Sequence, residues 1–122
     1  MSLEERIQSL LIEFEKNIPD IVATSIVKYD GFTIADTAKK GFDTKKYAAM
    51  TAGLYGISNR TMNTIDGGNL LQTYVKGEKT EIICIAVPTK KIFIAVVTNK
   101  DPNIGLIMYQ SEKLANDLKE VL

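Results

Sequence analysis

The chain has 122 residues, 45% of them hydrophobic and 25% charged, which is the composition of one folded domain rather than of a disordered segment. The charges of its 15 basic and 15 acidic residues cancel. Because nucleic-acid-binding proteins usually carry a surplus of basic residues, we expect no nucleic-acid partner. No apolar run is long enough to cross a bilayer, and the charged N-terminal segment is unlike a signal peptide, so we expect no membrane insertion. A lone cysteine fits a reducing compartment, and we expect a single cytoplasmic domain over residues 1–122.

The first predicted element is a helix that ends before Pro19. Apolar side chains recur at helical spacing from Leu3 to Phe14, and glutamates lie mostly on the opposite side. Ser2 and Glu5 have the spacing of a capping box, in which the two residues satisfy each other's free amides.

A β-hairpin is predicted next. One strand ends at Tyr29, the dipeptide Asp30-Gly31 follows, and a second strand begins at Phe32. Asp-Gly between two apolar runs is a strong hairpin signal because both residues tolerate a positive φ.

The longest predicted helix runs from about Asp43 to Ile65. Its apolar cover spans roughly 220° of the helix circumference, whereas a surface helix needs a stripe of roughly 100°. One face carries Tyr47, Met50, Leu54, Ile57, Thr61 and Ile65, the adjoining face Ala48, Ala52, Tyr55, Asn59 and Met62, and the remaining sector Ala49, Gly53, Gly56, Arg60 and Asn63. The sequence does not decide which face meets the sheet.

Two glycines inside this helix, Gly53 and Gly56, cost about 1 kcal/mol each relative to alanine. Close approach by another backbone would compensate for that cost. The alternative is that a small monomer buries the whole helix in its own core.

Three further strands and a helix complete the chain. Leu70–Lys76 alternates apolar and polar residues, which is typical of an edge strand. Glu81–Val87 and Ile92–Thr98 are almost continuously apolar and are predicted to be central strands. The last helix is predicted from about Asn103 to the C-terminus. The order α-β-β-α-β-β-β-α with short turns indicates an α+β fold, a three-layer α/β/α sandwich around a five-stranded, mainly antiparallel sheet.

The start of the last helix has some features of an anion site. Asp101-Pro102-Asn103 is typical of a helix start, and free amides at that end could bind an anion. The glycine loop and lysine of a phosphate site are missing, so we expect a junction in which Gly105 lets the helix lie close to a strand.

Catalytic chemistry is sparse. There is no histidine, no zinc-type cluster, and neither the GxxxxGK[ST] nor the GxGxxG pattern, so we expect no enzyme, no cofactor and no metal. The lone Cys84 would be the only plausible nucleophile, and its apolar surroundings favour a buried residue. The lysine pairs at Lys39-Lys40, Lys45-Lys46 and Lys90-Lys91 lie beside turns and are interpreted as solvated charge.

Three segments together resemble the Roadblock family, which includes dynein light chains and regulators of small GTPases. They are the hairpin IPDIVATSIVKYDGFTIADT, the alanine-rich YAAMTAGLYGISNRT and the closing KDPNIGLIMYQSEKLANDLKEVL, where Ile104 stands at a position commonly occupied by leucine. The resemblance implies a Roadblock/profilin-like fold with the first and last helices on one face of the sheet and the middle helix on the other. It also implies a dimer that pairs through the middle helix and the third strand, which agrees with the wide apolar cover and the edge character of those two elements.

The leading hypothesis is therefore a non-enzymatic homodimer that binds or regulates a Ras-like small GTPase through its paired middle helices. The alternative is a structural scaffold or motor-complex light chain that binds peptide segments of larger proteins. If an arginine were inserted into a GTPase, only Arg6 and Arg60 exist, and Arg60 is better placed. The expected dimer interface is Tyr47, Met50, Gly53, Leu54, Ile57, Leu70, Gln72 and Tyr74, and the expected partner surface is Ala49, Gly56, Arg60 and Asn63.

Overall fold

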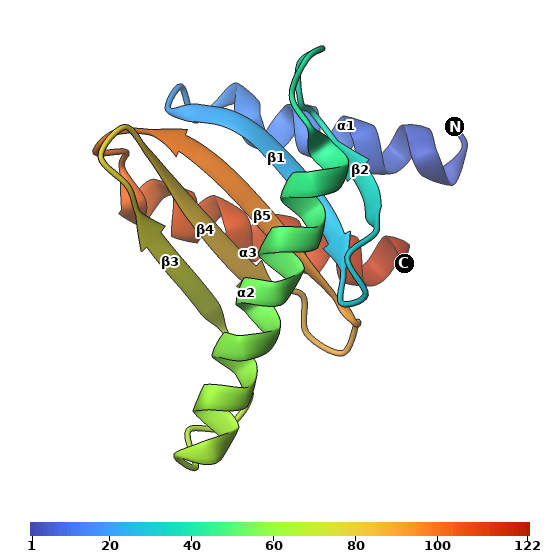
Figure 1. Ribbon diagram of the computed structural model, residues 1–122. Helices are drawn as coiled ribbons and strands as arrows, with labels where there is room; N and C mark the ends of the chain where they lie inside the picture. Colours follow the sequence, from blue (N-terminus) through green and yellow to red (C-terminus); the bar gives the residue numbers. More distant parts are fainter.

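The chain folds into three helices and five strands in the predicted order (Figure 1). The computed structural model describes residues 1–122. The elements are α1 (Leu3–Lys16), β1 (Ile21–Lys28), β2 (Thr33–Asp36), α2 (Thr44–Thr64), β3 (Gln72–Lys76), β4 (Thr80–Ala86), β5 (Ile92–Asn99) and α3 (Ile104–Val121). None of the helices combines the length and the apolar character that crossing a membrane requires.

All five strands form one sheet in the spatial order β2-β1-β5-β4-β3, and each neighbouring pair is antiparallel. The prediction that the third strand lies at an edge is confirmed, as is the central position of the fourth and fifth strands. The short β2 forms the opposite edge and pairs only with the second half of β1, from Ser25 to Val27.

The predicted hairpin at Asp30-Gly31 is present with a longer loop. The amide of Gly31 donates to the carbonyl of Lys28 at 2.9 Å, and the amide of Lys28 donates to the carbonyl of Phe32 at 2.8 Å, which leaves three residues in the loop. Gly31 alone in this loop has a positive φ, +95°. The loop is thus a turn followed by a left-handed glycine, a common hairpin type.

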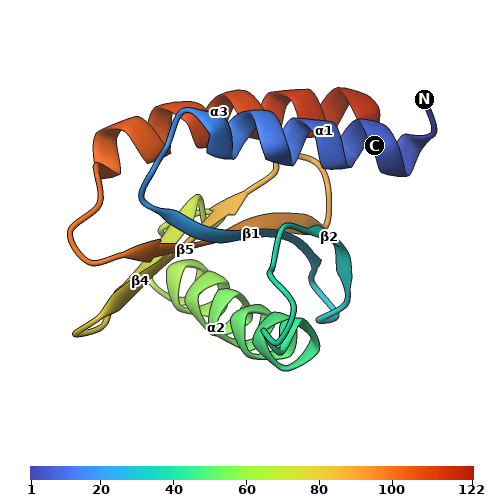
Figure 2. The same cartoon turned by 90° about the horizontal axis from the view of Figure 1, so that it is seen from above.

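The helices cover the sheet in two layers (Figure 2). α1 and α3 lie side by side on one face, and α2 crosses the other face. Fifteen buried residues form the core between α1, α3 and the sheet, and seven form the core beneath α2. This three-layer arrangement confirms the predicted fold class.

The helix starts follow the sequence signals, but one packing contact predicted for α3 is absent. Ser2 and Glu5 form the predicted capping box at α1, with the Glu5 amide 3.1 Å from Ser2 Oγ. At α3 the Oδ1 of Asn103 accepts from the amide of Leu106 at 3.1 Å. The expectation that Gly105 brings α3 against a strand is wrong, because a Cβ at that position would have only the Asn103 side chain nearby, at 3.7 Å.

Candidate interaction surface

The structure decides which face of α2 meets the sheet. Ala48 and Tyr55 of the second predicted face are buried, and Ala52 and Met62 pack against the same cluster. The ring of Tyr55 stacks on Phe93 of β5 with centroids 4.6 Å apart. Burial, followed by the hydrogen bond with Tyr29, raises the pKa of the Tyr55 phenol. This contact fixes the orientation of α2 on the sheet.

The other apolar face of α2 points away from the protein. Met50 is 67% exposed and Ile57 is 60% exposed, while Leu54 is half-buried. The alternative that a monomer buries the whole helix in its own core is therefore wrong. Apolar side chains in a row on an exposed helix face are typical of a protein–protein contact.

The two helical glycines lie on open surface. A Cβ built at Gly53 would have no neighbour within 4 Å, and at Gly56 it would meet only Nη1 of Arg60, at 3.7 Å. No backbone of the same chain comes close enough to explain either glycine. The cost of these glycines is thus not offset inside the single chain, and the surface above them is free for a close approach.

The outer edge of β3 has free backbone groups. The Ala86 amide donates to the Leu71 carbonyl and the Gly77 amide to the Thr80 carbonyl, both at 2.9 Å. Hydrogen-bonded and non-bonded pairs alternate along an antiparallel ladder. The backbone groups of Gln72, Tyr74 and Lys76 therefore point away from β4, toward the unpaired edge.

The predicted interface residues fall into three groups. Met50, Gly53, Leu54 and Ile57 lie on the outward side of α2, and Gln72 and Tyr74 lie on the free edge. Leu70 differs, because it is buried in the cluster beneath α2 and its amide donates to Asn59 Oδ1 at 2.9 Å. In the single chain Leu70 therefore fixes the start of β3 rather than presenting a surface.

Tyr47 is the third case. It is half-buried, and its ring packs edge-on against Phe42 with centroids 5.4 Å apart. Its hydroxyl is buried without a hydrogen-bond partner, and burial raises the pKa of the phenol. Tyr47 therefore packs against the core beneath α2 and is only partly available to a second subunit.

A buried carboxylate, not predicted from the sequence, lies behind the β3 edge. Glu81 is 1% exposed, and its two oxygens accept from the Tyr74 hydroxyl and, at 3.0 Å, from the Asp101 amide. The hydrogen bond to Glu81 raises the pKa of Tyr74, and the Asp101 carboxylate, 3.1 Å away, raises the pKa of Lys76. This network joins the edge strand to the turn before α3. The pattern of Glu81 with Ile83 on one strand face could have indicated it.

The predicted partner surface lies on the side of α2 next to the predicted dimer interface. A Cβ at Gly31 would be 3.5 Å from Ala49 Cα, so this side adjoins the β1–β2 hairpin. The side of Ile57 adjoins β3 instead, across a hollow of about 290 Å³. Of the partner set, Ala49, Arg60 and Asn63 are exposed and Gly56 is half-buried. The two predicted surfaces thus occupy neighbouring sides of one helix.

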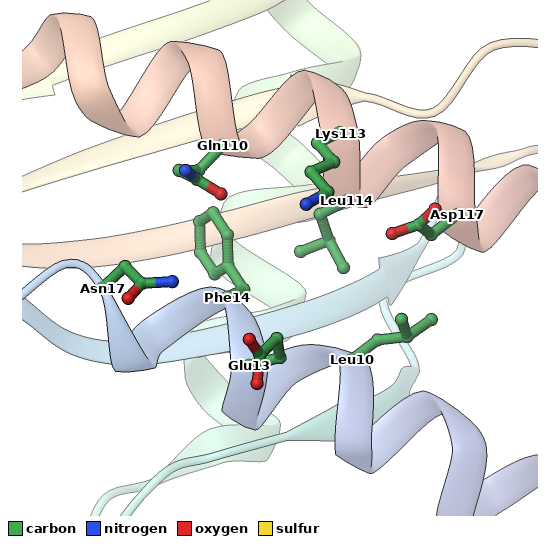
Figure 3. Close-up of a pocket in the computed structure, with 8 residues that line it drawn as sticks. All are labelled: Leu10, Glu13, Phe14, Asn17, Gln110, Lys113, Leu114 and Asp117. Atoms are coloured by element: carbon green, nitrogen blue, oxygen red, sulfur yellow. The ribbon is translucent and has the colours of Figure 1, made fainter.

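The space between α1 and α3 is small. The gap between α1 and α3 in Figure 3 has a volume of about 60 Å³. It is lined by Leu10, Glu13, Phe14, Asn17, Gln110, Lys113, Leu114 and Asp117. That volume holds about two water molecules. No group of three or more histidine, cysteine, aspartate or glutamate side chains is placed to hold a metal ion. Cys84 is buried, and burial raises the pKa of its thiol to about 12.

The family model of the Roadblock/LC7 domain matches residues 7–98. The chain therefore belongs to the Roadblock/LC7 family, whose members are generally non-catalytic regulatory or adaptor domains. In sequence it is similar to an uncharacterised protein of Methanocaldococcus jannaschii, with 28% identity over 113 residues that cover 93% of this chain and 96% of that protein.

Solved structures show the same fold. MglB of Myxococcus xanthus superimposes with a TM-score of 0.86 at 17% identity, covering 95% of this chain and 94% of that chain. Profilin II of Acanthamoeba castellanii superimposes with a TM-score of 0.56 at 21% identity, covering 88% of this chain and 94% of that chain. At these identities the likeness concerns the fold.

Proposed function

We propose that the protein is a homodimeric interaction module that binds or regulates a Ras-like small GTPase through its paired α2 helices. The observation that carries this proposal is the apolar outward side of α2 next to the free edge of β3. Pairing two copies there would cover Met50 and Ile57 and would satisfy the edge backbone in one step.

The geometry supports an interface that uses both elements together. Apolar side chains at the centre and strand pairing at the side supply burial and register, the two features that a stable dimer needs. Gly53 would let the two α2 backbones approach, which offsets the cost of a glycine in the middle of the helix.

The GTPase assignment rests on membership of the Roadblock/LC7 family, which includes regulators of small GTPases. Ala49, Arg60 and Asn63 are exposed and share a sector of α2 with Gly53, so we propose that the GTPase binds beside the contact between the two α2 helices. Arg60 is exposed, and its Nη1 lies 3.7 Å from the position of a Cβ at Gly56, so its guanidinium lies along its own helix. We therefore propose that the protein acts by positioning groups of the GTPase itself and not by inserting an arginine.

A pull-down tests the GTPase assignment. Purified protein would be mixed with Ras-like GTPases of the same organism, loaded with GDP or with a non-hydrolysable GTP analogue. We expect retention of one GTPase that depends on the nucleotide, and an unchanged rate of GTP hydrolysis when Arg60→Ala replaces the wild type. Loss of stimulation in Arg60→Ala would contradict the positioning mechanism, and absence of any retained GTPase would contradict the assignment.

A second candidate function is a scaffold that binds peptide segments of larger proteins. A hollow of about 340 Å³ beside α3 and the start of β3, lined in part by Leu71 and Met108, favours it. Leu71 is 75% exposed there. A scaffold would bind its partner equally well whichever nucleotide is present, so the same pull-down separates the two functions.

A further inference from the structure

Positive charge is concentrated at the connection between β2 and α2. Four of the eight residues from Lys39 to Lys46 are lysines, although the chain as a whole is neutral. The one acidic residue in this segment, Asp43, uses Oδ1 to accept from the Lys46 amide at 3.0 Å and so caps α2. We call Lys39, Lys40, Lys45 and Lys46 the basic loop surface.

These lysines have no anionic partner within the protein. All four are exposed. The chain contains two ion pairs, Lys28 with Asp30 and Lys76 with Asp101, and neither involves the basic loop surface. Figure 1 shows the connection projecting beyond the end of the sheet, where a partner can reach it. Unpaired like charges held together repel one another, and an opposite charge relieves that repulsion.

A hollow of about 530 Å³ lies next to this charge. Because β2 pairs only from Ser25 onward, the first residues of β1 are left uncovered there. Val22 is the extra residue of a bulge between β1 and β5 and is 39% exposed, and Phe42 is 37% exposed. The hollow is lined by Glu15, Ile21, Val22, Ala23, Thr37, Lys39, Lys40, Gly41, Phe42 and Asn99.

One carboxylate also faces the hollow. The Thr37 hydroxyl donates a hydrogen bond to the Glu15 carboxylate. The oxygen of the same hydroxyl accepts a hydrogen bond from the Thr24 amide at 2.9 Å. This network ties α1 to the end of the β1–β2 pair. The negative charge of Glu15 therefore lies on the side of the hollow formed by α1. Lys39 and Lys40 supply positive charge on the side formed by the connection between β2 and α2.

We propose that the hollow and the basic loop surface together bind an acidic segment of a partner protein. Carboxylates of the segment would lie over the lysines, and an apolar side chain would fill the space between Val22 and Phe42. The hollow is concave and its mostly polar lining includes Val22 and Phe42, which suits one apolar side chain flanked by polar ones, whereas a flat anionic bilayer would leave the hollow empty and would face Glu15. The site goes beyond the proposed GTPase contact and adjoins the proposed dimer face, because Phe42 packs on Tyr47 at the start of α2.

The test uses the full chain labelled with ¹⁵N and, as probe, a short peptide in which glutamates flank a central leucine. We expect saturable shifts of the amide signals of Val22 and of Lys39 to Phe42 at low ionic strength, and weaker binding as salt is added. Lys39→Glu with Lys40→Glu should weaken binding by about tenfold, since two attractions become repulsions. Lys79→Glu with Lys91→Glu makes the same change in net charge on exposed turns elsewhere and should change the affinity less than about twofold.

Three results would overturn the proposal. Equal losses in the two double variants would show that only net charge matters. Absence of saturable shifts at Val22 and Phe42 would remove the hollow from the site. Tighter binding to phosphatidylserine vesicles than to the peptide, abolished by the same Lys39 and Lys40 changes, would assign the surface to a membrane. Circular dichroism of each variant ensures that only folded proteins are compared.

Discussion

The two helical layers cover the same sheet in different ways. α1 and α3 pack against each other and close a core of 15 buried residues, whereas α2 stands alone over a core of seven. α2 nevertheless carries large apolar side chains on its outward side, where Met50 and Ile57 are mostly exposed. This surplus apolar surface on a lone helix is the basis of our proposal that the protein associates with a second copy.

The largest expected change in a reaction rate concerns Cys84, beneath α2. With a pKa of about 12 in place of 9.0, its thiolate fraction at pH 8 falls about 1000-fold; because a more basic thiolate is also more nucleophilic, labelling by a disulfide reagent should slow by about 30-fold or more. Labelling should speed up about tenfold per pH unit until that pKa is approached. The unfolded protein in urea is the control and should react as an ordinary thiol. Fast labelling of the native protein would show that the α2 layer is open.

Phe93→Ala tests whether the core beneath α2 contributes as much to stability as the core beneath α1 and α3. The side chain is fully buried and stacks on Tyr55, so the substitution should lower the free energy of unfolding by about 3–5 kcal/mol. Leu11→Ala in the opposite layer should cost about 2–5 kcal/mol. Urea unfolding at one fixed protein concentration measures both, because the stability of a dimer depends on concentration. A loss below about 1 kcal/mol for Phe93→Ala would mean that α2 is loosely attached.

Ile57→Glu separates the outward side of α2 from the rest of the surface. A charge placed in a dimer interface loses its hydration, so the dimer dissociation constant should rise by about 100-fold. Ile12→Glu on α1 is the matched control, since Ile12 is 58% exposed and Ile57 is 60% exposed. Analytical ultracentrifugation measures both variants. An equal effect of the two substitutions would place the interface elsewhere or on both layers.

A smaller effect is expected at the β3 edge. Glu81→Ala removes the acceptor for the Tyr74 hydroxyl and the Asp101 amide and should lower the free energy of unfolding by about 1–3 kcal/mol. Glu78→Ala, in the exposed turn before β4, should change it by less than about 0.5 kcal/mol. Chemical denaturation of the two variants gives the comparison. Equal values would show that the buried network does not hold the edge strand.

The fold could be predicted because each element has a local signal. The capping box at Ser2, the Asp30-Gly31 turn and the apolar runs of β4 and β5 are all visible in short windows of sequence, and the observed elements follow them closely. Antiparallel pairing then follows from the short turns between consecutive strands.

The orientation of α2 was not predictable from such signals. Two adjoining faces were both apolar, and the choice depends on Phe93, which is 38 residues from Tyr55 in the sequence and stacks on its ring. Leu70 was expected at the interface because it begins the predicted edge strand. In the structure its amide donates to Asn59 Oδ1, and its side chain is buried in the cluster beneath α2. Glu81 was missed because its partners meet only once β3 pairs with β4 and the chain turns at Asp101. Long-range contacts decide all three cases.

The central claim is that the outward side of α2 pairs with a second copy, and the molar mass in solution tests it most directly. Light scattering would be recorded for the wild type and for Gly53→Leu. Within one chain the new side chain meets nothing within 4 Å of its Cβ and removes a helix-weakening glycine, so the monomer should fold normally. We predict a wild-type dimer and a folded, monomeric Gly53→Leu. A monomeric wild type, or a Gly53→Leu variant that remains fully dimeric, would contradict the claim.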